Sequence, residues 1–470
     1  MKKTGAYELD MTTGALLPKM LRFALPLMLS SLLQLLFNAA DVAVVGKFAG
    51  DNSLAAVGST SALINLLTNL FLGLSIGANV LSAKFTGAGD KERTSKVVHT
   101  AVTVSLLSGC ILTVIGLMFA PQFLKMMKSP DGVIGLASLY MRVYFLGMPA
   151  MMFYNFGSSL LRSKGDTKRP LYYLTAAGVL NVLLNLLFVI VFRMDVAGVA
   201  LATIISQYMS AALVLRCLMK EEDEAFRVVI KKLGIDKVTL LNLIKIGVPA
   251  GIQGVVFSLS NVIIQSSVNG FGEIFIAGSS AASSIEGFVW VSMNAFHQAA
   301  LTFTSQNIGA KKYSRIKKIL FCSQGSTIVT GLVFGNLVYL FSPYLLHIYT
   351  DTPASIEAGI TRLSIICTTY FLCGMMDTIV GSIRGMGYGV VPTIVSMIGA
   401  CGLRLLWIAT IFQIPKFHTP EVLFTSYPVS WGITFLAHFV CFLIMRRKFP
   451  KVDEVAETIY ASQMKSKNSQ

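Results

Sequence analysis

The stretch RSKGDTKRP at residues 162–170 recurs in altered form as RGMGYGVVP at residues 384–392, 222 positions further along the chain. The two copies share an arginine, a glycine and a proline in the same register, and each copy joins two long apolar runs. Chance similarity between apolar runs does not keep loop residues of these types in register. The recurrence therefore indicates that the chain consists of two duplicated halves.

Other landmarks that precede this stretch in each half recur at nearly the same offset. The sequence FALP at residues 23–26 matches IGVP at residues 246–249. Phe-Ala-Pro at residues 119–121 matches Phe-Ser-Pro at residues 341–343. The duplication therefore extends over most of the chain.

The composition identifies lipid as the solvent for much of the chain. Of its 470 residues, 54% are hydrophobic and only 13% are charged, and the mean hydropathy is +0.68. A soluble domain of this size cannot bury so much apolar surface. A helix needs roughly 20 apolar residues to cross a bilayer. We therefore expect twelve membrane-spanning helices, at residues 23–45, 56–80, 97–119, 134–158, 171–192, 197–217, 246–268, 278–304, 319–341, 360–383, 390–413 and 428–446.

Basic residues are distributed unequally between the predicted loops. If the N-terminus is cytoplasmic, the inner segments hold 31 of them and the outer loops hold five, namely Lys47, Lys125, Lys128, Arg193 and Lys416. This is the positive-inside pattern, so we expect a multi-pass protein of the plasma or inner membrane with both termini in the cytoplasm. The same pattern explains the net charge of +16, and we expect no nucleic-acid partner.

Six spans in each half give the two halves the same orientation. The predicted fold class is an all-α membrane protein with twelve transmembrane helices in two parallel six-helix repeats, the N-lobe and the C-lobe. Transporters place the substrate site between such repeats, in a central cleft. The predicted segments are a cytoplasmic N-terminal segment (1–22), the N-lobe (23–218), a cytoplasmic linker (219–243), the C-lobe (244–446) and a cytoplasmic C-terminal tail (447–470).

The predicted linker contains the most highly charged run of the chain, KEEDEAFRVVIKK at residues 220–232. Opposite charges at this density are typical of a solvated helix with ion pairs along its surface. We expect the linker to form such a helix.

Six stretches resemble the multidrug and toxic compound extrusion (MATE) family, which belongs to a superfamily that includes flippases for lipid-linked oligosaccharides. They are LQLLFNAADVAVVGKFAG (33–50), LLRSKGDTKRP (160–170), NVLLNLLFVIVFRMDVAGVALATIISQ (181–207), AASSIEGFVWVSMNAFHQAALTFTSQNIGAKK (281–312), and IRGMGYGVVP (383–392) followed by GLRLLW (402–407). The resemblance covers about residues 16–446. It implies two six-helix lobes around a central cleft, in which entry of H+ or Na+ drives small organic cations out.

Asp41 is the first candidate for ion coupling, because an ionisable group inside an apolar span is costly and therefore suggests a function. Gln34, Asn38 and Asp41 have i, i+4, i+7 spacing and share one helical face. We assign Asn38 and Asp41 to ion coupling and Gln34 to the cleft. The alternative is a polar cap near the outer interface. In the MATE family an acid at the matching place contributes to cation coupling.

Asn181 and Asn185 lie one helical turn apart in the fifth span, and Asn155 in the fourth span is expected to face them. Buried amides need hydrogen-bond partners, and a cluster around Asp41 would supply them. We include the three asparagines among the ion-coupling candidates, with structural hydrogen bonding as the alternative. Some family members carry aspartate where Asn185 stands, so their proton mechanism does not transfer unchanged.

In the second half, Glu286, Trp290, Met293 and His297 lie on one face of the eighth span. An acid, an aromatic ring and a thioether together suit a flat organic cation. We therefore assign Glu286 to ion coupling and Trp290 and Met293 to the cleft. The alternative is that the last two only pack against neighbouring helices. We expect lone His297 and His438 to make ordinary hydrogen bonds rather than a proton relay.

Asp377 in the tenth span is the remaining ion-coupling candidate, and a buried ion pair with Arg404 is its alternative role. Some family members bind a cation through acids of the second lobe, one of them near this position. Their acid in the seventh span is missing here, where Asn261 and Gln265 lie on one face and are assigned to the cleft.

These patterns favour a secondary transporter of organic cations over two other classes. A flippase for lipid-linked sugars would need several basic residues in its cavity, and the membrane-embedded basic residues are nearly limited to Arg404. An enzyme would need a nucleotide-binding, metal or nucleophile motif, and none is present. We expect a monomer that contacts membrane lipids and has no cofactor apart from the coupling ion.

Overall fold

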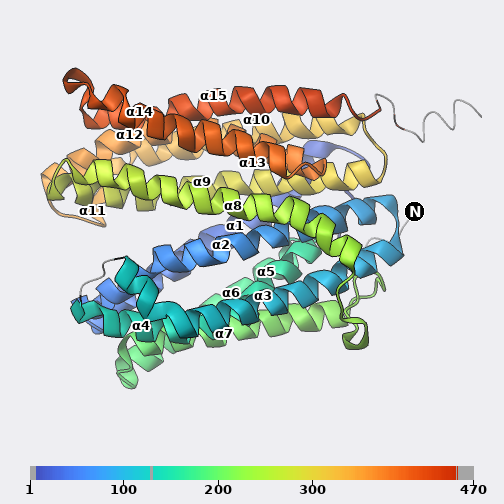
Figure 1. Ribbon diagram of the computed structural model, residues 1–470, viewed down its shortest axis with the longest axis horizontal. Coiled ribbons are helices and arrows are strands. Elements are labelled where there is room, and N and C mark those ends of the chain that lie inside the picture. The colour runs from blue at the N-terminus through green and yellow to red at the C-terminus, as the bar shows by residue number, and fades with distance from the viewer. Residues whose placement is uncertain (1–6, 128–130, 451–452, 454–470) are drawn as a thin grey trace, which may run out of the picture. The chain divides into compact units, whose positions relative to one another are not determined.

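Figure 1 shows the computed structural model, which describes residues 7–127, 131–450 and 453. In these residues all regular structure is helical. The helices of the first half are α1 (Leu16–Phe48), α2 (Asp51–Ala88), α3 (Lys91–Met126), α4 (Asp131–Phe145), α5 (Met148–Ser163), α6 (Lys168–Asn185), the π-helix η1 (Leu186–Val191) and α7 (Asp195–Met219). The 3₁₀ turn η2 (Ile230–Lys232) follows α7.

The helices of the second half begin with α8 (Lys237–Asn269), α9 (Glu273–Gly309), α10 (Arg315–Leu340), α11 (Ser342–His347) and α12 (Pro353–Gly385). They continue with α13 (Val390–Ser396), the π-helix η3 (Met397–Gly402), α14 (Leu403–Ala409), the 3₁₀ turns η4 (Ile411–Gln413) and η5 (Pro415–Phe417), and α15 (Pro420–Arg446). The helix α12 packs against α9, α10 and α15 (Figure 1).

The expected membrane spans are confirmed, with one change in the fourth. Among the described residues, eleven helical segments are long and apolar enough to cross a membrane, and a bent helix pair supplies the twelfth. The sequence predicted one continuous span at residues 134–158, whereas α4 and α5 meet at an angle of 48°. Pro149 in the first turn of α5 lacks the backbone N–H that could donate to a carbonyl of α4. At the bend, the hydroxyl of Tyr208 donates a hydrogen bond to the carbonyl of Leu146 at 3.0 Å.

The chain divides into two compact units that do not coincide with the sequence repeats. Unit 1 contains the described residues up to Leu9, then Leu29–Phe85 and Asp90–Val255, and unit 2 contains Asp10–Met28, Thr86–Gly89 and the chain from Val256 onward. Both α1 and α8 therefore contribute to two units: the first part of α1 packs with unit 2, and the first part of α8 packs with unit 1.

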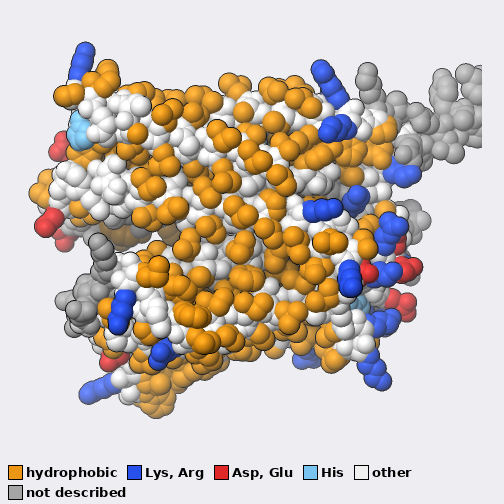
Figure 2. All heavy atoms as spheres, in the orientation of Figure 1, with side chains coloured by type: hydrophobic (Ala, Val, Ile, Leu, Met, Phe, Trp, Pro, Cys, Tyr) orange, Lys and Arg blue, Asp and Glu red, His pale blue; other side chains and the backbone are white. Residues whose placement is uncertain are grey.

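The surface of the helices is suited to lipid. Figure 2 shows hydrophobic side chains over most of the visible helical surface, with Lys, Arg, Asp and Glu gathered near the helix ends. Leu183, Leu436 and Val440 are examples of large apolar side chains that are more than half exposed. Exposed apolar area on this scale is characteristic of membrane proteins. The chain is a multi-pass membrane protein.

The RSKGDTKRP stretch forms a tight turn between α5 and α6. Gly165 has φ of +97°, and Gly387 in the second copy has φ of +96°, a region that favours glycine because a Cβ is disfavoured there. The carboxylate of Asp166, which is fully buried, accepts from the backbone N–H of Arg169 at 3.1 Å and pairs with its guanidinium. The turn therefore fixes the start of α6.

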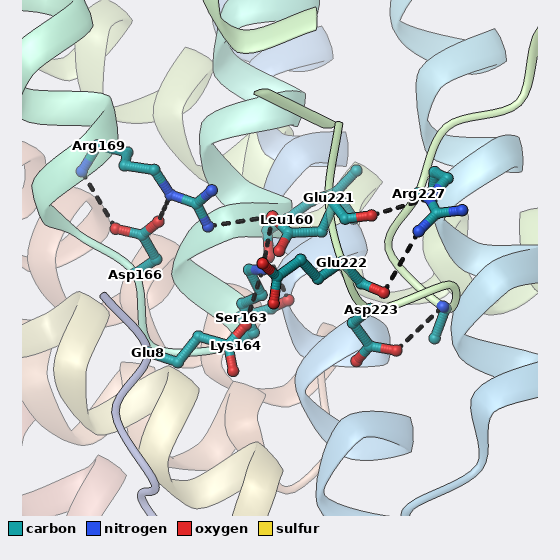
Figure 3. A network of polar contacts seen from close by, with 11 residues as sticks. Glu8, Leu160, Ser163, Lys164, Asp166, Arg169, Glu221, Glu222, Asp223 and Arg227 are labelled. Carbon is teal, nitrogen blue, oxygen red and sulfur yellow. Dashed lines mark hydrogen bonds and ion pairs between the residues drawn. The ribbon is translucent and has the colours of Figure 1, made fainter. Parts of the chain in front are cut away.

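An ion network surrounds this turn (Figure 3). Lys164 lies 2.7 Å from Glu221 and 2.9 Å from Glu8, and Arg169 lies 3.0 Å from Glu221. Burial on its own would raise the pKa of Glu221, but the bonds and charges of Lys164 and Arg169 outweigh it and hold that pKa below its usual value. The network joins the N-terminal residues, the α5–α6 turn and the end of α7.

Replacing Glu221 with glutamine should destabilise the folded protein at neutral pH by roughly 2 kcal/mol, the value typical of hydrogen bonds to charged groups. Because the folded-state pKa of Glu221 is lowered, its contribution is present above the unfolded-state pKa and is lost as the pH falls through the folded-state value. Thermal unfolding of the purified protein at pH 7 and at progressively lower pH measures this. A Glu221→Gln deficit that grows on acidification would contradict the network.

The predicted linker helix is wrong for residues 220–236. Within this segment the only helical piece is the short turn η2, and α8 begins at Lys237. Phe226 and Val228 are buried, and the backbone N–H of Val229 donates to Nε2 of His99 at 3.1 Å. The dense opposite charges predicted a solvated helix, because the pattern does not reveal that the apolar residues between them are buried and that the backbone bonds to α3. The predicted C-terminal tail lies mostly outside the described residues.

Candidate functional site: polar groups within the apolar helices

The centre of the unit 1 site is a contact between Asp41 of α1 and Asn185 of α6. The amide nitrogen of Asn185 donates to Oδ1 of Asp41, as the sequence predicted. Asp41 is half-buried and Asn185 is fully buried. An uncompensated carboxylate is costly in an apolar environment, so this donor helps to hold Asp41 inside unit 1.

A second amide and a hydroxyl extend the cluster. The amide nitrogen of Asn185 also lies 3.4 Å from Oδ1 of Asn181, and Asn181 donates to the hydroxyl oxygen of Thr203 on α7 at 3.4 Å. Oδ1 of Asn185 is buried and has no hydrogen-bond partner among the described residues. An unsatisfied buried acceptor is expensive, and it gives the cluster an oxygen that can accept a proton donor or a cation.

The backbone changes its winding directly after this cluster. The π-helix η1 begins at Leu186, the residue after Asn185. Single π-helical turns inside α-helices are rare and often mark functional sites. The predicted fifth span, at residues 171–192, is therefore an α-helix that continues as a π-helix rather than one uniform helix. Periodicity of apolar residues does not distinguish these two windings over so few residues.

Two tyrosines and a threonine near Asp41 were missed by the sequence analysis. The rings of Tyr140 and Tyr144 stack at 5.8 Å on α4, and both hydroxyls lie within electrostatic range of Asp41. Their i, i+4 spacing in a predicted span was the available signal. Thr203 had no comparable signal, because one hydroxyl in an apolar helix more often bonds to its own backbone.

The three other residues predicted for the unit 1 site make no hydrogen bond with this cluster that the structure records. Asn155 donates to the carbonyl of Met151 in its own helix at 2.8 Å, so its amide does not make the expected contact with the other asparagines. Gln34 and Asn38 are exposed on the chain's surface. Their role in coupling or binding remains a prediction.

Glu286 of α9 has a partner that the sequence analysis missed. Its two carboxylate oxygens accept from Nε and Nη2 of Arg362 on α12, at 2.8 and 2.9 Å, and both side chains are buried. Ser279 accepts from the same guanidinium at 2.9 Å, and the ring of Phe424 lies 5.3 Å from it. This is the two-bond geometry of a strong arginine–carboxylate pair. Arg362 was detectable as a basic residue inside a predicted span.

Asp377 of α12 is bound by α9 rather than by Arg404. The indole N–H of Trp290 donates to Oδ2 of Asp377 at 3.4 Å, and Nδ1 of His297 lies 2.6 Å from the backbone carbonyl of Asp377. Arg404 donates to Ser430 at 2.8 Å and lies 4.3 Å from the ring of Tyr427. The proposed direct ion pair between Asp377 and Arg404 is therefore not formed.

The other unit 2 candidates have ordinary environments. Met293 is buried in the apolar core between α9, α11 and α12, so packing explains its place on the same face as Glu286 and Trp290. Asn261 is exposed, and Gln265 donates to Asn269 in the same helix at 3.1 Å. His438 is buried and bonds to Ser396 at 3.0 Å, as predicted for a structural histidine.

The membrane-embedded arginines are more numerous than the sequence analysis counted, and they are engaged. Arg362 pairs with Glu286, and Arg404 is bound by a hydroxyl and aromatic rings. Two separate carboxylates, Asp41 and Asp377, have no ion-pair partner within 4.0 Å in the described residues. Among these residues no cluster of three His, Cys, Asp or Glu side chains could hold a metal ion. A carboxylate without an ion-pair partner is a group that a proton or a cation can neutralise.

The duplicated helical membrane fold and the titratable groups inside its apolar helices define the class of protein as a membrane transporter. The MatE family model matches residues 26–187 and 249–409, once in each half of the chain. The chain belongs to this family of multidrug and toxic compound extrusion transporters.

Curated relatives and solved structures agree with this assignment. The probable multidrug resistance protein YoeA of Bacillus subtilis is 29% identical over 422 residues, which cover 88% of this chain and 90% of the relative. The multidrug export protein MepA of Staphylococcus aureus is 22% identical over 390 residues, which cover 83% and 86%.

Two solved structures illustrate the likeness in fold. A MOP superfamily transporter from Pyrococcus furiosus has a TM-score of 0.88 at 21% identity, with 95% of this chain and 99% of that chain covered. An outward-facing multidrug resistance MATE family transporter has a TM-score of 0.86 at 20% identity, with 95% and 99% covered. At these identities the structures show the fold alone. The predicted fold class is confirmed.

Proposed function

We propose that this chain exports small amphipathic organic cations across the plasma or inner membrane by antiport with H+ or Na+. The observation that carries the proposal is the contact of Asp41 with Asn185, beside a buried amide oxygen that has no hydrogen-bond partner among the described residues. A carboxylate, two amide oxygens and the Thr203 hydroxyl form a set of hard oxygen donors. Such a set can accept a proton or coordinate a small cation.

In this proposal Asp41 binds the coupling ion at one stage of the transport cycle and is free of it at another. A bound H+ or Na+ neutralises the carboxylate and so lowers the cost of keeping it in an apolar environment. If the organic cation binds the ion-free form more tightly, ion and drug must weaken each other's binding by the same factor. Downhill ion entry can then drive drug export through alternating access, and Trp290, whose side chain is accessible, is proposed to contact the drug.

The cellular setting follows from the same proposal. Both termini lie in the cytoplasm, the protein works as a monomer in contact with membrane lipids, and the coupling ion is its only cofactor. The names of YoeA and MepA support export of drugs as the activity. A flippase for lipid-linked sugars is disfavoured because Arg362 already pairs with Glu286.

Ethidium transport in energised membrane vesicles tests this function. The proton gradient and the sodium gradient are collapsed separately, and vesicles without the protein serve as the control. We expect transport to stop when one of the two gradients is removed, which also names the coupling ion. Transport that survives the loss of both gradients would contradict antiport.

A further inference from the structure

Helix α9 holds Asp377 of α12 at two points that lie two helical turns apart. Trp290 donates to the carboxylate of Asp377 at 3.4 Å. His297, seven residues later on the same face of α9, contacts the backbone carbonyl of Asp377 at 2.6 Å. Trp290 is 42% exposed, whereas His297 is 6% exposed. The carboxylate of Asp377 is therefore bound by an accessible side chain, and the backbone carbonyl of Asp377 is bound by a buried one.

The direction of the buried hydrogen bond follows from its acceptor. A backbone carbonyl can only accept, so the proton of this bond is on Nδ1 of His297. A carbonyl oxygen has two lone pairs and can accept from outside its helix as well as from within it. The bond therefore adds a fixed point to the turn of α12 that carries Asp377.

Gly381, one turn beyond Asp377, makes this approach sterically possible. A Cβ at Gly381 would lie 2.5 Å from the carbonyl oxygen of His297 and 3.2 Å from its Nδ1. Real Cβ atoms do not approach backbone oxygens so closely, so a side chain at this position would push α9 and α12 apart. The close crossing of the two helices and the histidine bond are parts of one arrangement.

We infer that His297 is a positioning residue: its Nδ1–H bond to the Asp377 carbonyl holds the turn of α12 from which the Asp377 carboxylate reaches Trp290. The inference rests on the proposed function in one respect, namely that Asp377 takes part in ion coupling. Its structural part stands without that function. Other charged or titratable groups that interact with Asp377 are Cys373 and Arg384 on α12 and Arg404 on α14.

Two variants separate positioning through the hydrogen bond from simple packing. Asparagine places its amide N–H close to the position of histidine Nδ1 but lacks the ring, whereas leucine keeps a similar volume and lacks a donor. If the bond matters, His297→Asn is tolerated and His297→Leu is not. If only packing matters, the order is reversed. Gly381→Ala should reproduce the effect of His297→Leu, because it separates the same helices.

The spectroscopic test needs no transport. The chain has three tryptophans, so a Trp407→Phe/Trp431→Phe background leaves Trp290 as the only indole reporter. In that background Asp377→Asn defines the emission of Trp290 without a carboxylate partner. We expect His297→Leu to move the Trp290 emission maximum most of the way to that reference and His297→Asn to leave it at the parent value. An unchanged maximum in His297→Leu, or no difference between Asp377→Asn and the parent, would overturn the inference.

Ethidium transport supplies the functional measurement. Loss of one hydrogen bond of about 1 kcal/mol corresponds to roughly a fivefold change, so we expect about a fivefold loss in His297→Leu and near-normal transport in His297→Asn. If the emission shifts as expected while transport is unchanged in every variant, Asp377 is not a coupling residue, and that part of the inference is overturned without affecting the role of Asp41. Loss of transport in His297→Asn with near-normal transport in His297→Leu would support packing, and either that order or equal loss in both variants would overturn positioning through the hydrogen bond.

Discussion

Replacing Asp41 with asparagine is expected to abolish gradient-driven export while the protein still folds and reaches the membrane. The new amide has nearly the same shape, and its oxygen can still accept from Asn185. It cannot bind and release a proton, and it carries no charge to attract Na+. Coupling between two ligands typically changes affinity 5- to 150-fold, so we expect ethidium affinity to lose a dependence on the ion of roughly that size and gradient-driven accumulation to disappear. Ethidium transport in energised vesicles measures the loss.

Glu357→Gln is the matched control for this experiment. Glu357 lies near the start of α12 and is exposed, so the same carboxylate-to-amide change removes a charge without touching either buried cluster. Its transport should equal that of the unchanged protein. Full export by Asp41→Asn at normal abundance would remove Asp41 from the coupling mechanism.

Replacing Glu286 with glutamine is expected to destabilise the protein strongly. The change leaves the Arg362 guanidinium buried without its counter-charge. Breaking a buried ion pair by removing one partner typically costs about 3–5 kcal/mol. The measurement is thermal unfolding of detergent-solubilised protein, followed as the fraction that stays monodisperse on heating. A melting temperature equal to that of the unchanged protein would show that the pair does not form.

A double variant separates the stability of this pair from its function. Glu286→Leu with Arg362→Met removes both charges, and apolar replacement of a whole buried pair is often neutral or stabilising. We expect stability to recover. Because Arg362 occupies both carboxylate oxygens of Glu286, we expect export to recover as well. Recovered stability with no export would assign ion coupling to Glu286, as the sequence analysis first suggested.

Much of the fold was predictable because each span is an autonomous apolar segment. Length and hydropathy were enough to predict the spans. Loop residues such as Gly165 and Gly387 were enough to predict the duplication, because their positive φ values restrict the residue type. The bend between α4 and α5 was not predicted, because apolar character continues across Gly147. The irregular linker was missed because its contacts are distant in sequence, for example Lys164 against the ring of Phe226 and His99 of α3 with the backbone of Val229.

The candidate site was predictable only where the partners lay on one helix or carried charge. The contact of Asp41 with Asn185 was expected, because both are polar groups inside spans and need partners. The partner of Glu286 was not, since a periodic stripe on α9 says nothing about which residue of α12 faces it. Distances between helices decide such pairings, and no single-sequence pattern contains them.

Ion release on drug binding is the most direct test of the central proposal, that ion and organic cation bind in competition through Asp41. Purified protein loaded with H+ or Na+ is titrated with ethidium, and the released ion is measured with a pH indicator or by loss of bound radioactive sodium. The account predicts release of one of these ions from the unchanged protein and none from Asp41→Asn. Drug binding without ion release, or equal release from both proteins, would contradict it.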